Sequence, residues 1–417
     1  MSLLQSCFGI VVLLGIAVLF SEQRCAIHYK VIVLALMIQV TLAFILLKIP
    51  FFKELFLLLN QAVLMIEQAT QAGSQFVFGY LGGGELPFEA TDQNATFILA
   101  FQALPIILVM SALSYLFYYY RILPAVVHFF GFLLRKTLRT SGTVGLGVAA
   151  NAFVGMVEAP LLIKPYLNQM SRAELFAVMV AGMSTIAGTM MVLYAHILTT
   201  AGIEAALGHI LTASVLNVVA ALMIALIIIP QPPAESTPTV ILPQLSYSAM
   251  DAIVQGTADG VKLLINIIAM LIVLLALVHL VNQVLNFLPA VGGEPLTLQR
   301  LLGVIMAPLT FLLGIPADEL LTAGALLGKK IILNELIAYI DLAQLSPESL
   351  SPRSRLIMIY ALCGFANIGS LGIMIGGMTV MAPQKRDVII DLGVKSMLAG
   401  VLATCLTATV VGGVLLF

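Results

Sequence analysis

The chain has 417 residues, of which 61% are hydrophobic and only 9% are charged. Soluble globular domains are typically about 25% charged, so a chain of this composition cannot cover the surface of a soluble particle of its size. The mean hydropathy of +1.11 agrees with this conclusion. The formal net charge of −1 provides no basic balance for binding a nucleic-acid polymer. The composition therefore predicts a polytopic membrane protein with the lipid bilayer as its surroundings.

Eight apolar runs approach the ~20 residues that a helix needs to cross a bilayer. Between the second and third runs, residues 53–96 are polar and rich in glycine, and their loosely helical apolar spacing favours a helix lying on the membrane interface. The proline-rich segment 231–247 is typical of a linker and divides the chain near its middle. The apolar runs are residues 3–20, 31–49, 97–119, 175–198, 207–229, 263–284, 356–379 and 394–417.

Basic residues gather after the first and third runs and before the last one. Under the positive-inside rule these segments lie in the cytoplasm, which places both chain termini outside and gives a consistent alternation. We therefore expect a multi-pass protein of the cytoplasmic membrane, that is, an inner or plasma membrane. The residues concerned are Arg24, Lys30, Arg121, Arg135, Lys136, Arg139, Lys385, Arg386 and Lys395.

Two further apolar stretches, residues 144–163 and 320–339, are interrupted by glycine, amide and charged residues. Counting either as a full crossing would put later basic segments on the wrong side. Both are therefore predicted to be re-entrant helical hairpins, which dip into the membrane and return. Irregular backbone at membrane depth is tolerated only where protein or a water-filled cavity covers it.

The two predicted hairpins resemble each other. Each contains a carboxylate, Glu158 or Glu335, and each precedes a span with a polar break, at residues 184–188 or 364–370. One odd crossing separates the copies, so they enter the membrane from opposite sides. This pattern predicts an all-α inverted repeat, and paired interruptions in two halves indicate the central site of a transporter.

Glu158 and Glu335 are the strongest candidates for ligand binding. A carboxylate at the bilayer centre costs ~2.5–3.5 kcal/mol on insertion scales, so two at corresponding points of a repeat indicate a function. Both are able to accept hydrogen bonds from hydroxyl or N–H groups of a polar solute. The alternative is that each reaches the interface or pairs with a lysine, Lys164 or Lys330.

Other polar residues lie near the predicted breaks. Asn367 and Ser370 are three residues apart and share a face if that segment is helical; the alternative is a polar pair that joins neighbouring helices. Asn151 and Thr185 offer neutral oxygens to a hard cation such as Na⁺. The sequence contains no nucleotide-binding loop and no histidine cluster, so we predict that the protein is not an enzyme.

Three segments resemble the signature motifs of the concentrative nucleoside transporter family. They are residues 150–160 (ANAFVGMVEAP), 334–339 (NELIAY) and 363–370 (CGFANIGS), which occur in the family's order. The resemblance implies eight transmembrane helices, two re-entrant helical hairpins and interfacial helices. It also implies a homotrimer held together by the third and sixth spans, and an elevator-like movement of a transport domain in each protomer.

Residue by residue, the resemblance implies two sites. Glu335, Asn367 and Ser370 would hold the ribose, with Phe365 packed beside the ligand, and Glu158 would face the base. The family's usual Gly-Gln-Thr-Glu reads Gly-Met-Val-Glu at residues 155–158, and a methionine replaces a smaller aliphatic residue at 190. The implied substrate-binding residues are Met156, Val157, Glu158, Met190, Glu335, Phe365, Asn367 and Ser370, and the implied cation ligands are Asn151, Val154, Thr185 and Ile186.

The sequence thus predicts a sodium-coupled symporter that imports nucleosides. Coupling to H⁺, another small polar solute as cargo, and a receptor or subunit without transport activity remain as alternatives. The preference for purines or pyrimidines stays open. The predicted division is residues 1–96 for the N-terminal spans and interfacial helix, 97–120 for a scaffold span, 121–230 for the first transport repeat, 231–260 for a linker, 261–290 for a second scaffold span and 291–417 for the second transport repeat.

Overall fold

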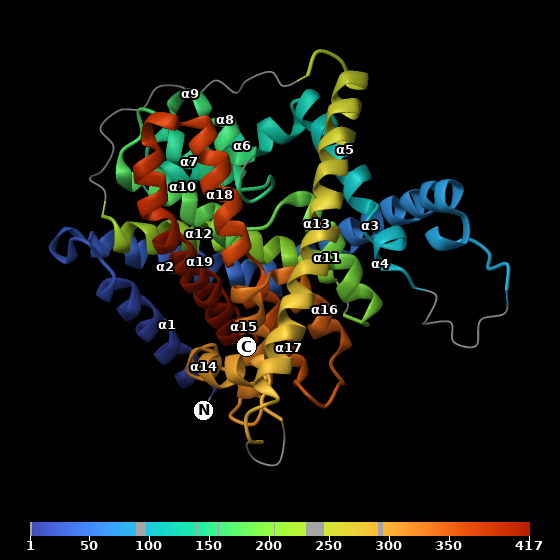
Figure 1. Ribbon diagram of the computed structural model, residues 1–417. Helices are drawn as coiled ribbons and strands as arrows, with labels where there is room; N and C mark the ends of the chain where they lie inside the picture. Colours follow the sequence, from blue (N-terminus) through green and yellow to red (C-terminus); the bar gives the residue numbers. More distant parts are fainter. Residues whose placement is uncertain are drawn as a thin grey trace.

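The structure is a computed structural model that describes residues 2–88, 97–138, 140–156, 158–203, 205–230, 246–290 and 295–417. Within these ranges the regular elements are helices and no strand is present (Figure 1). The first half contains α1 (Ser2–Leu19), α2 (Tyr29–Lys48), α3 (Pro50–Phe78), α4 (Leu99–Gln102), α5 (Ile106–Tyr119), α6 (Ile122–Leu138), α7 (Gly142–Ala150), α8 (Glu158–Leu162), α9 (Lys164–Leu167), α10 (Arg172–Ser184), α11 (Gly188–Thr200) and α12 (Ala206–Ile228). The second contains α13 (Ala249–Leu285), α14 (Leu298–Leu312), α15 (Leu320–Ile332), α16 (Glu335–Gln344), α17 (Pro352–Leu362), α18 (Ile368–Met381) and α19 (Arg386–Val414).

Six helical stretches of the described chain are long and apolar enough to cross a membrane. The predicted runs 3–20 and 356–379 are not among them. The first forms α1, whose apolar part Leu3–Leu19 is shorter than any of the six, and the second is divided into α17 and α18. The expected count of eight crossings therefore stays a prediction. The six stretches are Tyr29–Lys48, Leu99–Tyr119, Arg172–Thr200, Ala206–Ile228, Ala249–Leu285 and Pro383–Val414.

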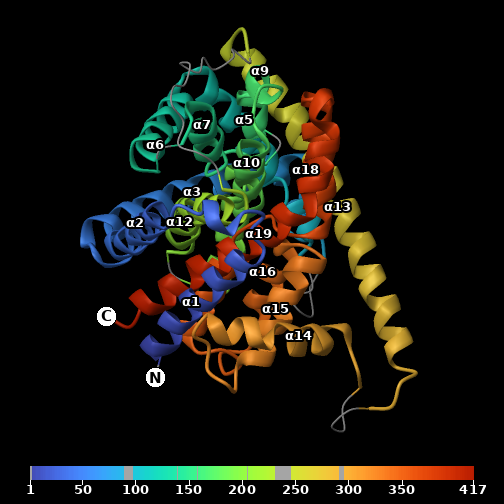
Figure 2. The same cartoon turned by 90° about the vertical axis from the view of Figure 1, so that its left-hand side faces the viewer.

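The order of elements occurs twice along the chain. α6, α7, α8 and the broken pair α10–α11 are followed by α12, and α14, α15, α16 and the broken pair α17–α18 are followed by α19. The first set of short helices, α6 to α9, gathers at one end of the molecule, and α14 to α16 gather towards the opposite end (Figures 1 and 2). This placement agrees with the predicted inverted repeat.

The interior is formed by the helices that follow the short ones. α19 packs on α10, α12 and α17, and α10 also packs on α12. In contrast, α13 crosses in front of other helices in Figure 1, runs along the right-hand edge of the molecule in Figure 2, and packs chiefly on α5. The two helices approach closely because Gly256 has no side chain: a Cβ there would lie 2.7 Å from the Cα of Ala112.

Two helices are interrupted where the sequence predicts polar breaks. α10 ends at Ser184 and α11 begins at Gly188, while α17 ends at Leu362 and α18 begins at Ile368. The breaks touch each other, because the backbone N–H of Phe365 donates a hydrogen bond to the carbonyl oxygen of Thr185 at 3.2 Å. The predicted interruptions are therefore confirmed, and they meet in space.

One predicted boundary is wrong. The division assigned residues 231–260 to a linker, but α13 begins at Ala249, where the Ser248 hydroxyl accepts a hydrogen bond from the backbone N–H of Asp251 at 3.1 Å. Asp251 and Asp259 lower the hydropathy of the N-terminal part of α13. This part of the helix is therefore not recognised as an apolar run in the sequence. The first part of the predicted interfacial stretch 53–96 forms a helix, α3, which ends at Phe78, and residues 89–96 lie outside the described residues. The position of α3 at a membrane interface stays a prediction.

Candidate functional site

A cavity of about 280 Å³ opens between the turn that precedes α8, the two helix breaks, the start of α16 and the middle of α13. The expected substrate-binding residues come from four segments that are far apart in the chain, and the described ones all line this one cavity. Val157 lies outside the described residues. The lining includes Met156, Glu158, Met190, Glu335, Phe365, Asn367 and Ser370.

Glu335 is the most constrained residue of the cavity. Its side chain is 4% exposed. Oε1 accepts a hydrogen bond from the Tyr194 hydroxyl at 2.6 Å, and Oε2 accepts one from the Asn367 amide nitrogen at 2.9 Å. Each carboxylate oxygen has a second lone pair, so the group is oriented by the protein and is still able to accept hydrogen bonds from a ligand.

The local sequence explains why these groups converge. Asn334 and Asn367 each stand immediately before a helix and cap it: the Asn334 Oδ1 accepts from the N–H of Ile337 at 2.9 Å, and the Asn367 Oδ1 accepts from the N–H of Ser370 at 2.7 Å. Asparagine is a preferred N-cap residue. Glu335 is thus the first residue of α16, where the positive end of the helix dipole stabilises a carboxylate.

Glu158 occupies the corresponding position of the first repeat, as the first residue of α8. Its carboxylate folds back over the preceding turn. Oε2 of Glu158 lies only 2.1 Å from the position that a Cβ would occupy at Gly155, so the turn requires a residue without a side chain there. Met156 and Met190 are buried beside it. Lys164, the alternative partner considered from the sequence, is exposed. This end of the cavity therefore combines one carboxylate with flexible apolar side chains.

Sequence reasoning missed several polar residues of the site, among them Thr189 and Asn334, which also line the cavity. Tyr194 lies on α11 and reaches Glu335, and Asn266 lines the cavity from α13. A tyrosine and an asparagine in otherwise apolar spans were available signals. Asn266 comes from α13, the helix that packs chiefly on α5 and lies outside the two repeats. The cavity is therefore lined both by the repeats and by α13.

Replacement of Tyr194 by phenylalanine is expected to raise the KM for nucleosides by about tenfold or more, since a hydrogen bond to a charged group is worth ~1.5–3 kcal/mol. Tyr339 provides a matched control: its ring lies 4.9 Å from that of Tyr194, but its hydroxyl donates to the backbone carbonyl of Ile359 at 2.8 Å. The concentration dependence of uptake measures both variants. Equal effects of Tyr194→Phe and Tyr339→Phe would show that the bond to Glu335 has no special role.

A second group of polar atoms lies behind the cavity, at the expected cation site. Asn151 is 0% exposed, and its Nδ2 donates to the carbonyl oxygen of Gly147 at 3.0 Å, while its Oδ1 has no hydrogen-bond partner in the described structure. A buried carbonyl oxygen without a donor is costly. The donor set therefore fits a cation that would bind this oxygen.

The other expected ligands lie in the irregular segments next to Asn151. Val154 is in the turn between α7 and α8, and Thr185 and Ile186 form the break between α10 and α11. The two segments are joined, because the N–H of Gly188 donates to the carbonyl of Phe153 at 3.0 Å. The Thr185 hydroxyl donates to Ala181 at 2.9 Å and keeps its lone pairs. No cluster of three or more His, Cys, Asp or Glu side chains suited to a metal occurs in the described chain.

Broken helices, a largely apolar cavity with a buried carboxylate at the breaks and an apolar exterior define a membrane transporter of the all-helical kind. Comparison with known families gives the particular one. Residues 8–81 and 209–412 match the N- and C-terminal models of the Na⁺-dependent nucleoside transporters, and residues 100–201 match a nucleoside-recognition model named Gate. The chain belongs to the concentrative nucleoside transporter family, as its motifs predicted, and it is not an enzyme.

Relatives of known name support this assignment over the whole chain. The nucleoside permease NupC of Helicobacter pylori is 36% identical over 99% of this chain and 97% of its own length. The sodium/nucleoside cotransporter 1 of Rattus norvegicus is 32% identical over 98% of this chain and 63% of its own length. The structure of CNTnw in an inward-facing substrate-bound state superposes with a TM-score of 0.88 at 31% identity, covering 99% of this chain and 98% of the other.

Proposed function

We propose that the protein is a sodium-coupled symporter that imports nucleosides across the cytoplasmic membrane. The observation that carries this proposal is the pairing of two sites. Glu335 is held open to the cavity by Tyr194 and Asn367, and the buried oxygen of Asn151 lies next to the helix break on the other side. One site takes a polar solute and the other a hard cation.

The ribose is the part of a nucleoside that fits the Glu335 end. Two vicinal hydroxyls donate to the two oxygens of a carboxylate, as a bidentate donor does, and Asn367 and Ser370 flank the same spot. Phe365 supplies an apolar surface beside the ring. The base then extends towards Glu158, Met156 and Met190.

This end of the cavity is expected to discriminate weakly among bases. Met156 does not form hydrogen bonds with a base edge, and an ionised Glu158 only accepts, so bases that present N–H groups are favoured. The flexible side chain of methionine adapts to larger rings. A site rejects a similar base strongly only when that base would leave a buried polar group of the protein without a partner, and methionine provides no such group. Purine nucleosides should therefore compete with labelled uridine at least as well as uridine itself does.

Competition assays on the wild type and on Met156→Gln/Val157→Thr test this expectation, with the double variant predicted to gain base discrimination. Asn266 is the residue that could restore selectivity in the wild type, because it lines the cavity from α13. Strict pyrimidine preference that persists in the double variant and disappears in Asn266→Ala would assign base recognition to α13 instead.

The arrangement of helices supports an elevator-type movement. The carboxylates, the breaks and the cation ligands belong to the two repeats, whereas α13 packs chiefly on α5, which also contacts α6 and α11. We propose that the two repeats move together past α5 and α13. We also propose that the hairpin of each repeat is re-entrant, so that it enters and leaves the membrane on the same side. Exposed apolar side chains along α13, such as Ile265, Ile272 and Leu280, would face lipid and the neighbouring copies of a homotrimer.

Coupling arises because solute and ion stabilise the same closed state. A ligand shifts a conformational equilibrium only through its differential affinity for the two states. The cation site and the solute cavity share the break at residues 185–187. The carbonyl oxygen of Thr185 in this break accepts a hydrogen bond from the backbone N–H of Phe365, which lines the solute cavity. A proton is the second candidate ion, since Glu335 is a buried carboxylate.

Binding to the purified protein tests the proposal directly. Calorimetric titration with uridine and adenosine should give tighter binding in NaCl than in choline chloride at constant ionic strength. Free uracil and free ribose, each occupying only one end of the cavity, should bind weakly. Nucleoside affinity that is identical with and without Na⁺ would contradict the coupling, and equal affinity for free bases would contradict the ribose site.

A further inference from the structure

Two charged side chains are buried in the described structure, and they lie five residues apart in the chain. Lys330 is 0% exposed and Glu335 is 4% exposed; all the other buried polar side chains in the described ranges are neutral. A buried charge is strongly unfavourable unless hydrogen bonds and opposite charges compensate it. Lys330 therefore requires an explanation beyond packing.

Lys330 does not form an ion pair with Glu335, although the sequence suggested that pairing. Its ammonium nitrogen donates to the backbone carbonyl of Ala361 at 2.8 Å and to the Thr404 hydroxyl at 2.9 Å. Ala361 is in the last turn of α17 and Thr404 is in α19. The positive charge thus lies at the carbonyl end of α17, where the helix dipole favours a cation.

These bonds connect the two segments that lead to the ribose site. From Lys330 the chain runs through the end of α15 to Glu335, and from Ala361 it runs through the helix break to Asn367. The two chain segments meet again where the Asn367 amide donates to Glu335 at 2.9 Å. The two chain segments are therefore joined at both ends, by the Lys330–Ala361 hydrogen bond at one end and by the Glu335–Asn367 hydrogen bond at the other. We call this closed loop the ring of contacts, and within it the position of Lys330 constrains the position of Glu335 relative to Asn367.

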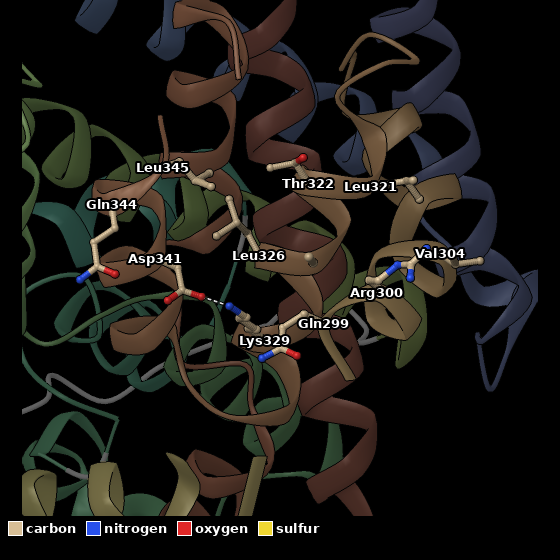
Figure 3. Close-up of a pocket in the computed structure, with 11 residues that line it drawn as sticks. Gln299, Arg300, Val304, Leu321, Thr322, Leu326, Lys329, Asp341, Gln344 and Leu345 are labelled. Carbon is tan, nitrogen blue, oxygen red and sulfur yellow. Dashed lines mark hydrogen bonds and ion pairs between the residues drawn. The ribbon is translucent and has the colours of Figure 1, made fainter. Parts of the chain in front are cut away.

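The adjacent lysine has a different environment. Lys329 points into a separate groove between α14, α15 and α16 and forms an ion pair with Asp341 (Figure 3). Successive residues of an α-helix point about 100° apart, which explains why one lysine is in a groove and the next is in the interior. Lys329 thus provides a control with the same side chain, one residue away and outside the ring of contacts.

We propose that Lys330 is a positioning residue for the ribose site. Its bonds to Ala361 and Thr404 fix the spacing between Glu335 and Asn367, and its charge offsets that of Glu335 in the interior. The identity of the ligand as ribose rests on the proposed function. The inference itself concerns the geometry of the Glu335–Asn367 pair, and it predicts a specific loss of hydroxyl recognition.

The test compares the affinity for a ribonucleoside with that for the matching 2′,3′-dideoxynucleoside, measured by calorimetry on detergent-purified protein. Lys330→Met, which keeps an unbranched side chain one atom shorter and removes the charge and donors, should reduce the preference for the ribonucleoside by about tenfold or more. Binding of the dideoxynucleoside should change little, because it does not use the hydroxyl contacts. Lys329→Met should keep the wild-type ratio.

Thr404 provides a second, milder comparison if Lys330→Met does not fold. Thr404→Val removes one acceptor of the Lys330 ammonium and should lower the ratio, whereas Thr404→Ser retains the hydroxyl and should preserve it. A ratio unchanged in folded Lys330→Met, or equal in Thr404→Val and Thr404→Ser, would overturn the positioning role alone. A wild type that binds no nucleoside, or shows no preference for the ribonucleoside, would overturn the proposed function and this inference together.

Discussion

Glu335→Gln is expected to lose ribonucleoside transport almost entirely. The carboxylate accepts from Tyr194 on one oxygen and from Asn367 on the other, and a glutamine offers only one acceptor oxygen in its place. The NH₂ group of the glutamine would face the hydroxyl of Tyr194 or the amide of Asn367, and that donor would have no acceptor. The ribose hydroxyls would also lose a charged acceptor. Two hydrogen bonds to a charged group correspond to at least about a hundredfold in affinity.

Initial uptake rates over a wide range of uridine and adenosine concentrations measure this effect. Asp341→Asn is a matched control, since Asp341 is a second carboxylate on α16 whose partner is Lys329 in the separate groove (Figure 3). It should retain most of the transport. Normal transport by Glu335→Gln, with the variant inserted and folded, would show that the ribose is held elsewhere.

Asn151→Leu is expected to raise the Na⁺ concentration required for half-maximal uptake, or to uncouple solute from ion. Leucine has a similar volume but removes the buried Oδ1, which has no hydrogen-bond partner in the described structure, and the donor to Gly147. A hard monovalent cation that loses one neutral oxygen loses affinity, while the solute cavity keeps its lining. The Na⁺ dependence of uptake at fixed nucleoside concentration and fixed pH measures the change.

Asn168→Leu is the control for this variant, because Asn168 is exposed at the end of α9. It should leave the Na⁺ dependence unchanged. If Asn151→Leu and the wild type respond identically to Na⁺ while both transport nucleosides, the cation binds at another place.

Much of the solute site could be predicted from the sequence because its signals are local. A carboxylate in an apolar run, as at Glu335, is costly enough to mark a function. The breaks were predicted because polar residues and glycine interrupt runs that are otherwise uniform. The structure then places Glu158, Glu335 and Asn367 around one cavity, which periodicity alone does not show.

The rest of the site depends on contacts between distant segments, which have no local signature. Tyr194 reaches Glu335 over a separation of 141 residues, and Lys330 reaches Thr404 over 74. In the sequence, Lys330 and Lys329 are equivalent, and only the packing of α15 separates a buried ammonium from one in a groove. The start of α13 was missed for a different reason, because charged first turns such as that of Asp251 do not resemble a membrane span.

Uptake by the purified protein in proteoliposomes tests the central claim most directly. Labelled uridine and adenosine would be supplied with an inward Na⁺ gradient, with equal Na⁺ on both sides, and with a proton gradient in Na⁺-free buffer. Sodium-coupled symport predicts accumulation above the external concentration only with the Na⁺ gradient, and its loss in Glu335→Gln. Undiminished accumulation in Na⁺-free buffer, or no accumulation of either nucleoside, would contradict it.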